Sequence, residues 1–294
     1  MTRLQVCLLG FGEVGQTLAQ DLRARVGRLT AWDLKFSDAA SAPSRAAPRL
    51  EVLAAADAKS GAAVADVVIS AVTAAQIGAA ARSVAPHLKR EAYFFDLNST
   101  SPAAKRDAAG VIDAAGGRFV EAAIMSPIAP RGAASAMLLG GVHAAAFLPL
   151  ASELGFKDAK LFSGKLGAAS AAKMCRSVVV KGLEALLLES LLTARTHGVE
   201  DAVLDSLQAL LAVDNSRTAA RYMISRALTH GRRRGEEMRE AVRTVTEAGF
   251  APRMSGACAE WQEWAGHHSA AAANADLGTM LDTLLAAQRG GSAA

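Results

Sequence analysis

The sequence predicts an α/β domain with a doubly wound, mostly parallel sheet, followed by an all-α domain. Short apolar and β-branched runs alternate with helical patterns in the first half of the chain, which is typical of a sheet with helices on both faces. After about residue 162 only helical patterns remain. A long helix over residues 166–197 would join the two parts, so we expect domains at 1–162 and 163–294.

Six short apolar runs predict the strands of the first domain, because turn-forming or Ala-rich segments bound each of them. They lie at residues 3–9, 28–34, 65–72, 92–98, 118–125 and 133–141. Helical patterns predict the second domain after Gly198, a typical helix stop. They lie at residues 201–212, 214–230, 232–248 and 255–287.

The composition indicates a globular protein with a sizeable core. Hydrophobic residues make up 51% of the chain and the formal net charge is +4, which gives no reason to expect a nucleic-acid partner. No apolar run is long enough for a transmembrane helix, so no membrane partner is expected. Cys7, Cys175 and Cys258 lie far apart, which predicts neither a disulfide framework nor a metal site and fits a reducing cytoplasm.

A glycine-rich turn follows the first predicted strand and opens the first predicted helix. Gly10, Gly12 and Gly15 have the GxGxxG spacing in the sequence GFGEVG. In this context the first glycine permits a tight turn, the second lets the backbone approach a pyrophosphate, and the third lets the helix pack closely. An ordinary glycine-rich turn is the alternative, but the flanking strand and helix favour a dinucleotide site. The predicted site also includes the intervening residues Phe11, Glu13 and Val14.

Asp33 ends the second predicted strand, where a carboxylate would accept hydrogen bonds from an adenosine ribose. Such a carboxylate repels the 2′-phosphate that distinguishes NADP from NAD. Lys35 follows closely and counts against this preference, since its ammonium could pair with that phosphate. We therefore expect NAD or NADP as the cofactor, with NAD slightly favoured.

Three further stretches carry a family resemblance: DLNSTSP (96–102), FVEAAIMSP (119–127) and GAASAAKMCRS (167–177). In this order, after GxGxxG, they resemble the β-hydroxyacid dehydrogenase family. That family includes 3-hydroxyisobutyrate dehydrogenases and is related to 6-phosphogluconate dehydrogenase. The later part of the chain is similar to a branch with its own phosphogluconate-dehydrogenase-like C-terminal domain.

The resemblance implies an NAD(P)-binding Rossmann domain, a helical domain for substrate binding and dimerisation, and an active site in the cleft between them. It also implies a homodimer that forms through the helical domains. Lys173 falls on the family's catalytic lysine. Asn98 and Ser99 fall in the loop beside the nicotinamide and the substrate, and Val72 and Thr73 fall where the family lines the cofactor cleft.

The sequence departs from the family at the residues that would hold the substrate. The family usually has Ser-Gly-Gly where this chain has Met125, Ser126 and Pro127, and proline has no N–H to donate to a carboxylate. Ser177 stands where the family usually has asparagine. We therefore expect these residues to bind a substrate other than a simple 3-hydroxyacid.

Lys173 is the predicted catalytic residue. It lies in a helical run of small and apolar residues, where burial would lower the pKa of its amine toward working pH and suit it to general acid–base catalysis. The alternative is a lysine that extends from a core helix to solvent. We expect hydride transfer between a nicotinamide and the carbinol carbon of a small acidic hydroxy compound. Imine reduction on the same fold and non-catalytic dinucleotide binding stay open, although Lys173 argues against both.

Overall fold

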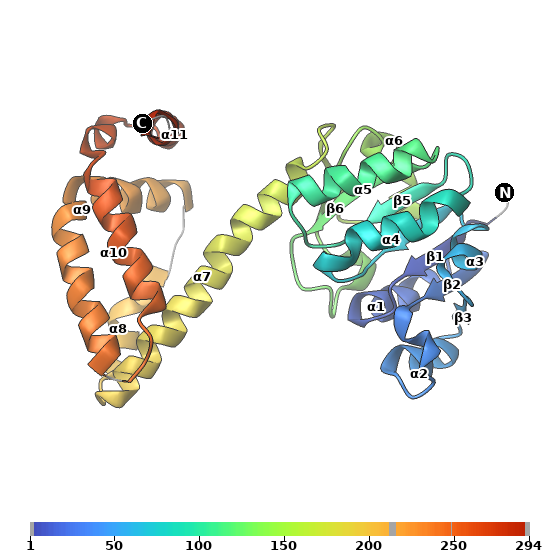
Figure 1. Cartoon of the computed structure of the whole chain (residues 1–294), viewed down its shortest axis with the longest axis horizontal. Coiled ribbons are helices and arrows are strands. Elements are labelled where there is room, and N and C mark those ends of the chain that lie inside the picture. Colours follow the sequence, from blue (N-terminus) through green and yellow to red (C-terminus); the bar gives the residue numbers. More distant parts are fainter. Residues whose placement is uncertain (1–2, 212–215, 248, 292–294) are drawn as a thin grey trace. The chain divides into compact units, whose positions relative to one another are not determined.

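The computed structural model of the protein describes residues 3–211, 216–247 and 249–291. The chain divides into two compact units, Met1–Val178 and Val179–Ala294. The first is α/β, and the described residues of the second form helices (Figure 1). The division falls inside the long helix α7 (Ala168–Thr196), whereas the boundary predicted after residue 162 lies at the end of the sheet.

The first unit contains one eight-stranded sheet with the strand order β3-β2-β1-β4-β5-β6-β7-β8. Neighbouring strands pair in parallel except β6 and β7, which pair antiparallel. The strand order reverses between β1 and β4, so their carboxyl ends flank the crevice where doubly wound sheets bind ligands. The strands are β1 (Gln5–Leu9), β2 (Arg28–Trp32), β3 (Leu53–Ala54), β4 (Val67–Ser70), β5 (Tyr93–Asp96), β6 (Arg118–Ile124), β7 (Met137–Gly140) and β8 (Ala159–Ser163).

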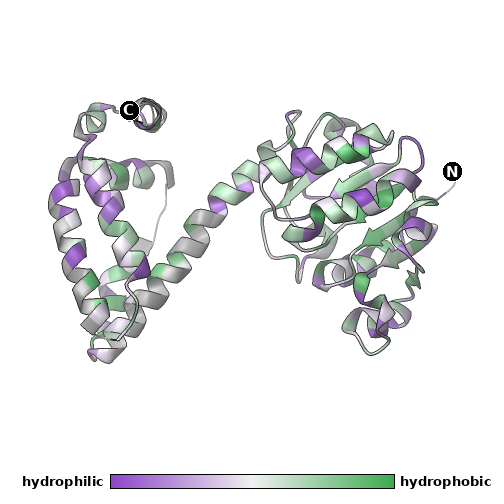
Figure 2. Ribbon diagram, in the orientation of Figure 1, coloured by the Kyte–Doolittle hydropathy of each residue, from purple (hydrophilic) through white to green (hydrophobic). Residues whose placement is uncertain are grey.

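Both faces of the sheet are covered by helices, because the central strands are apolar on both sides (Figure 2). Phe94 and Phe95 on β5 illustrate this, since adjacent residues of a strand point to opposite faces. Phe95 packs against Phe147 of α6 with ring centres 4.7 Å apart, and Phe94 stacks on Phe119 at 5.7 Å. The helices of this unit are α1 (Glu13–Leu22), α2 (Ala42–Arg49), α3 (Ala58–Ala62), α4 (Ile77–Val84), α5 (Pro102–Ala114), α6 (Ala144–Glu153) and the start of α7.

The predicted fold class is confirmed, and each of the six predicted strands is present with shorter bounds. The residues 133–136 that open the sixth predicted strand form a short 3₁₀ turn and its exit instead. Two strands were not predicted from the sequence. β3 has only two residues, and β8 is an edge strand whose side chains are largely exposed, so neither leaves a buried apolar run in the sequence.

The second unit continues from α7 into α8 (Glu200–Leu211), α9 (Ser216–Glu247), α10 (Arg253–Gly266) and α11 (Leu277–Gly291). The predicted break between helices at residue 231 is wrong, because α9 runs through Gly231. A Cβ at Gly231 would collide with the backbone oxygen of Gln262 on α10, so this glycine permits close helix packing. None of the helices in the described ranges has the length and apolar character needed to cross a membrane.

Candidate active site

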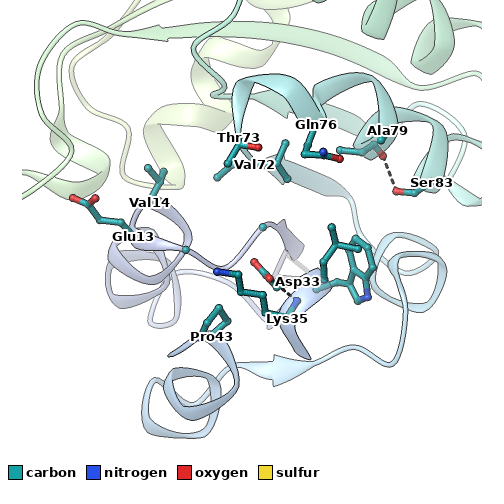
Figure 3. Close-up of a pocket in the computed structure, with 16 residues that line it drawn as sticks. Glu13, Val14, Asp33, Lys35, Pro43, Val72, Thr73, Gln76, Ala79 and Ser83 are labelled. Carbon is teal, nitrogen blue, oxygen red and sulfur yellow. Dashed lines mark hydrogen bonds between the residues drawn. The ribbon is translucent and has the colours of Figure 1, made fainter. Parts of the chain in front are cut away.

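A cavity of about 510 Å³ opens at the crevice between β1 and β4 (Figure 3). Its walls come from the glycine loop after β1, the turn after β2, the loop after β4 and one side of α4. Most of the predicted cofactor residues lie in these walls. They are Gly10, Gly12, Glu13, Val14, Asp33, Val72 and Thr73.

The glycine loop has the geometry that a phosphate cradle requires. Gly10 has φ +96°, and a Cβ there would collide with the carbonyl oxygen of Ala71. Gly12 is the N-cap of α1, and a Cβ built on it would meet no atom within 4 Å. Gly10 is thus required by the fold, whereas Gly12 leaves open space in front of a helix N-terminus, which favours anions.

Asp33 follows β2, and backbone hydrogen bonds hold its carboxylate at the rim of the cavity. Its Oδ2 accepts a hydrogen bond from the N–H of Phe11 at 2.7 Å, and its Oδ1 accepts one from the N–H of Lys35 at 2.9 Å. Each oxygen keeps a further lone pair for a ligand hydroxyl. The Lys35 side chain lies beside Asp33 in the same cavity, so an acid and a base stand together where the adenosine ribose is expected (Figure 3).

Three predicted cofactor residues do not line the cavity: Asn98 after β5, and Phe11 and Gly15 of the glycine loop. The Phe11 side chain is fully buried in the core, with its ring centre 6.0 Å from that of Phe36. Gly15 is buried within α1, and a Cβ there would collide with the carbonyl oxygen of Gly10. Phe11 and Gly15 support the loop without lining the cavity. The N–H of Phe11 donates a hydrogen bond to Asp33, and Gly15 allows α1 to pack against the turn.

Three buried polar side chains form a row across the sheet, at the carboxyl ends of β4 and β5 and in the middle of β6. Ser70 on β4 is in register with Asp96 on β5, and Asp96 is in register with Glu121 on β6. Residues in register on neighbouring strands point to the same face of a sheet. Each of the three has 0% of its surface exposed. Two carboxylates on adjacent strands at this depth each require a compensating partner.

Asp96 finds its partner in Lys105 on α5. The two side chains form an ion pair with neither exposed, and the Lys105 ammonium also donates to the backbone oxygen of Asp96 at 3.1 Å. Burial raises the pKa of the Asp96 carboxyl above its ordinary value, although contact with Lys105 opposes the rise. The Asn98 amide donates to Asp96 and, at 2.8 Å, to the Ser70 hydroxyl.

Glu121 finds its partner in the N-terminus of α7. Its Oε1 accepts hydrogen bonds from the N–H groups of Gly167 at 2.9 Å and Ala169 at 3.1 Å. Its Oε2 accepts a hydrogen bond from the Ser170 hydroxyl at 3.1 Å. Gly140 on β7 leaves room for the carboxylate, because a Cβ there would collide with Oε1. The first turn of α7 is therefore fixed to the sheet at the level of the carboxyl end of β5.

The predicted substrate residues lie near the same edge of the sheet. Lys173 and Ser177 are partly buried in the early turns of α7. Ser99 is exposed after β5, and Met125 follows β6 with its N–H donating to the Ala136 oxygen at 2.8 Å. The Ser126 hydroxyl is buried without a hydrogen-bond partner among the described residues. The structure thus places these residues at the carboxyl ends of β5 and β6 and at the start of α7; their roles stay predictions.

Sequence reasoning missed several residues of this region. Lys105 and Glu121 were not singled out. Glu121 has a signal in the sequence, because a lone charge inside an apolar run indicates a buried and paired group, whereas Lys105 is followed by Arg106 and Asp107 and has no such signal. The cavity walls also include Trp32, Gln76 and Ser83, which carry no motif of their own. Among the described residues, no group of three or more His, Cys, Asp and Glu side chains is arranged to hold a metal ion.

Comparison with known proteins finds two matching domains. Residues 5–148 match the NAD binding domain of 6-phosphogluconate dehydrogenase. Residues 194–265 match a domain of unknown function, DUF1932. The first match covers the glycine loop, the cavity and the polar row, and the second covers much of the helical unit.

Two solved structures are similar over nearly the whole chain. A conserved hypothetical protein from Sinorhizobium meliloti 1021 is 39% identical, with 92% of this chain and 90% of that chain covered and a TM-score of 0.59. The conserved protein MTH1747, of unknown function and structurally similar to 3-hydroxyacid dehydrogenases, is 30% identical, with 90% and 99% covered and a TM-score of 0.58. The chain belongs to the β-hydroxyacid dehydrogenase family, in the branch with a DUF1932 domain.

Some other solved structures with this fold are imine reductases and not hydroxyacid dehydrogenases. The imine reductase from Myxococcus stipitatus in complex with NADP⁺ is 17% identical, with 95% of this chain and 99% of that chain covered and a TM-score of 0.71. A V8 variant of that reductase is in complex with NAD⁺. At this identity the likeness shows a shared fold and not a shared substrate.

The residues of the cavity fit the dinucleotide that the family implies. Space at Gly12, a helix N-terminus for the pyrophosphate and a carboxylate for the ribose occur in the order in which the cofactor needs them. The carbonyl oxygen of the Asn98 side chain adds a buried acceptor without a hydrogen-bond partner in the described structure. Asn98 lies on the loop after β5, two strands along from the glycine loop.

Replacing Gly12 with valine tests the loop without disturbing the fold. The side chain would enter empty space, and the backbone of Gly12 (φ −76°) suits any residue, so stability should change little. Overpacking against the pyrophosphate costs about 1–3 kcal/mol, so the Kd for the dinucleotide should rise by about 5- to 150-fold. Isothermal titration calorimetry with NADH and NADPH measures this.

The matched control is Gly110→Val, at an exposed position of α5 where a Cβ also meets no atom within 4 Å. That variant should bind both dinucleotides with native affinity. Native binding by Gly12→Val itself would show that the pyrophosphate does not lie on this loop.

Proposed function

We propose that the protein is an NAD(P)-dependent oxidoreductase that transfers a hydride between the nicotinamide and the carbinol carbon of a small, acidic hydroxy compound. The observation that carries the proposal is that the cavity and the start of the helix with Lys173 lie on the same side of the sheet, where the parallel strands have their carboxyl ends. The dinucleotide-shaped cavity opens on this side, and Glu121 fixes the start of the Lys173 helix to the same side. The bound nicotinamide would supply or accept the hydride.

Lys173 is proposed to move the proton that accompanies the hydride. When a carbinol is oxidised, its hydroxyl must lose a proton, and an alkoxide forming in the reverse direction must gain one. A partly buried amine exchanges a proton near neutral pH more readily than an exposed one, because burial disfavours its charged form. Ser177, one turn further along α7, is proposed to hold the substrate through its hydroxyl.

The substrate pocket is proposed to be less polar than in the family's usual pattern. Met125 stands where a serine is usual, and Pro127 has no N–H to donate. The Ser126 hydroxyl is left as a buried hydrogen-bonding group on this loop. These residues support a substrate that does not rely on a nest of backbone N–H groups for its carboxylate.

Imine reduction is the second candidate, favoured by the shared fold with the reductase from Myxococcus stipitatus. A screen separates the two. Hydroxy acids, amines and the corresponding oxo compounds would be offered with both cofactors, and absorbance at 340 nm would report turnover. Turnover of hydroxy acids and not of amines supports the first proposal, and the reverse result supports the second.

We propose NAD as the preferred cofactor, with Lys35 as the residue that limits the preference. Asp33 presents a negative charge to a 2′-phosphate, whereas Lys35 offers a positive one from the same cavity wall. NADH should therefore bind more tightly than NADPH, and Lys35→Ala should widen the difference by up to about 5-fold, since an exposed pair contributes up to about 1 kcal/mol.

The ratio of the two Kd values, measured by quenching of protein fluorescence, checks this prediction. Lys59→Ala is the control, because Lys59 lies on α3 outside the cavity and carries the same charge. Tighter binding of NADPH than of NADH by the native protein would contradict the proposed preference.

A homodimer through the helical unit is also part of the proposal. Several large apolar side chains of this unit are exposed in the single chain, among them Tyr222, Met223, Trp261, Leu281 and Leu285. Monomeric proteins seldom leave many such groups uncovered. Their presence supports a protein partner on this unit, and a second copy of the chain is the partner that the family suggests.

A further inference from the structure

The buried carboxylate of Glu121 has a consequence for Lys173 that no motif records. Glu121 lies inside an apolar strand, is fully buried, and receives hydrogen bonds from two backbone N–H groups and one hydroxyl. All three groups donate to it, and a carboxylate is suited to accept all of them. Its contacts lie on one short segment, Gly167 to Ser170, where α7 begins.

The N-terminus of α7 carries a partial positive charge, and the Glu121 carboxylate counteracts it. An α-helix carries roughly half a positive charge at its N-terminus, which favours anions and disfavours cations close to that end. Side chains of a helix tilt toward its N-terminus, so a side chain of the second turn extends toward the first. Lys173 lies in the second turn, about 6 Å along the helix axis from Ala169 at 1.5 Å per residue. A negative charge at the helix start, as on Glu121, offsets this field and favours the charged form of a nearby ammonium.

The other charged groups that the described part of the first unit brings near the start of α7 differ from Glu121 in pairing or in sign. Asp96 is in register with it on the neighbouring strand, but Lys105 of α5 neutralises that carboxylate. Arg106 of α5 approaches Gly167, since a Cβ there would lie 3.0 Å from its Nη1, and this guanidinium adds to the positive field. Lys165, which precedes the helix, has the same sign.

We propose that Glu121 is a positioning residue that holds the first turn of α7 in place and sets the balance between the charged and neutral forms of Lys173. The inference rests on the proposed function only in the role of Lys173 as the proton carrier. The electrostatic coupling between the two residues is a property of this chain and requires neither cofactor nor substrate.

The test is a direct titration of Lys173. Lysines are reductively methylated with ¹³C-formaldehyde, and the resonance of Lys173 is identified by its loss from Lys173→Met. In Glu121→Gln the amide keeps the size of the side chain but removes the charge, so the pKa of Lys173 should fall by about 0.5–1 unit. Ser170→Ala is the matched control: it removes one hydrogen bond to Glu121 and keeps the charge, so the pKa should stay near its native value.

A second variant covers the case in which Glu121→Gln does not fold. Ala168→Asp adds a carboxylate to the first turn of α7, so the pKa of Lys173 should rise by a few tenths of a unit. An unchanged pKa in every folded variant of this pair overturns the inference.

Activity separates this inference from the proposed function. Once a substrate is identified, Glu121→Gln should shift the Lys173 limb of the pH profile of kcat to lower pH by the same amount as the titration shows. If Lys173→Met keeps native turnover while the titration shifts, the proposed function fails and the coupling stands. If Lys173→Met is inactive and neither titration nor profile shifts, the role of Glu121 fails.

Discussion

Replacing Lys173 with methionine should lower kcat by about 10²- to 10⁴-fold, the usual contribution of a general acid or base. Methionine keeps the length of the side chain and packs among the small residues of α7, so the helix and its attachment to Glu121 should survive. What is lost is the group that exchanges a proton with the substrate oxygen. The measurement is steady-state turnover on the substrate that the screen identifies.

The cofactor provides an internal control for this variant. The cavity at the glycine loop does not include Lys173, so the Kd for the dinucleotide should stay within about twofold of its native value. Lys165→Met is the matched control, since Lys165 is an exposed lysine just before the same helix. It should turn over normally. Near-native turnover by Lys173→Met would rule out this lysine as the acid–base group.

Local sequence patterns predicted the part of the site that one continuous segment builds. GFGEVG forms a strand, a turn and a helix within a few residues, and each glycine has a steric or spatial reason that holds in the structure. Asp33 was predicted from its place after the second strand, and it binds the loop through the N–H of Phe11. Such motifs can be read because their parts are close in the chain.

Contacts between distant segments could not be read in this way. Gly167 donates a hydrogen bond to Glu121 only because the start of α7 packs against β6. Asp96 and Lys105 form an ion pair only because α5 folds back over β5. The sequence shows Asp96 and Glu121 as single charges in apolar runs, and Lys105 within a short charged segment. It did not show which charge pairs with which group, since that depends on strand order and register. For the same reason Gly231 suggested a helix end, whereas its close contact with α10 explains it.

Removing the Lys105 ammonium should give the largest loss of stability among these changes. Lys105→Met leaves the Asp96 carboxylate buried without its cation, and breaking one partner of a buried pair costs about 3–5 kcal/mol. Lys89→Met is the matched control, because the Lys89–Asp66 pair at 2.8 Å is more than a third exposed and should contribute less than about 1 kcal/mol. Urea unfolding followed by Trp32 fluorescence, in a background of Trp261→Phe and Trp264→Phe, reports on the first unit.

The loss in Lys105→Met should also depend on pH in a defined direction. Burial already raises the pKa of Asp96 above its ordinary value of 3.8, and without Lys105 that rise is opposed only by hydrogen bonds from Ser70 and Asn98. A carboxyl with a raised pKa in the folded state binds more protons there than in the unfolded state, so stability falls as pH increases through the folded-state pKa. The variant should therefore be less destabilised at pH 5 than at pH 8. Asp96→Asn combined with Lys105→Met leaves no buried charge at these two positions and should recover much of the loss. A penalty that is equal at both pH values, and that the double variant does not reduce, would show that Lys105 stabilises the protein through packing and not through its charge.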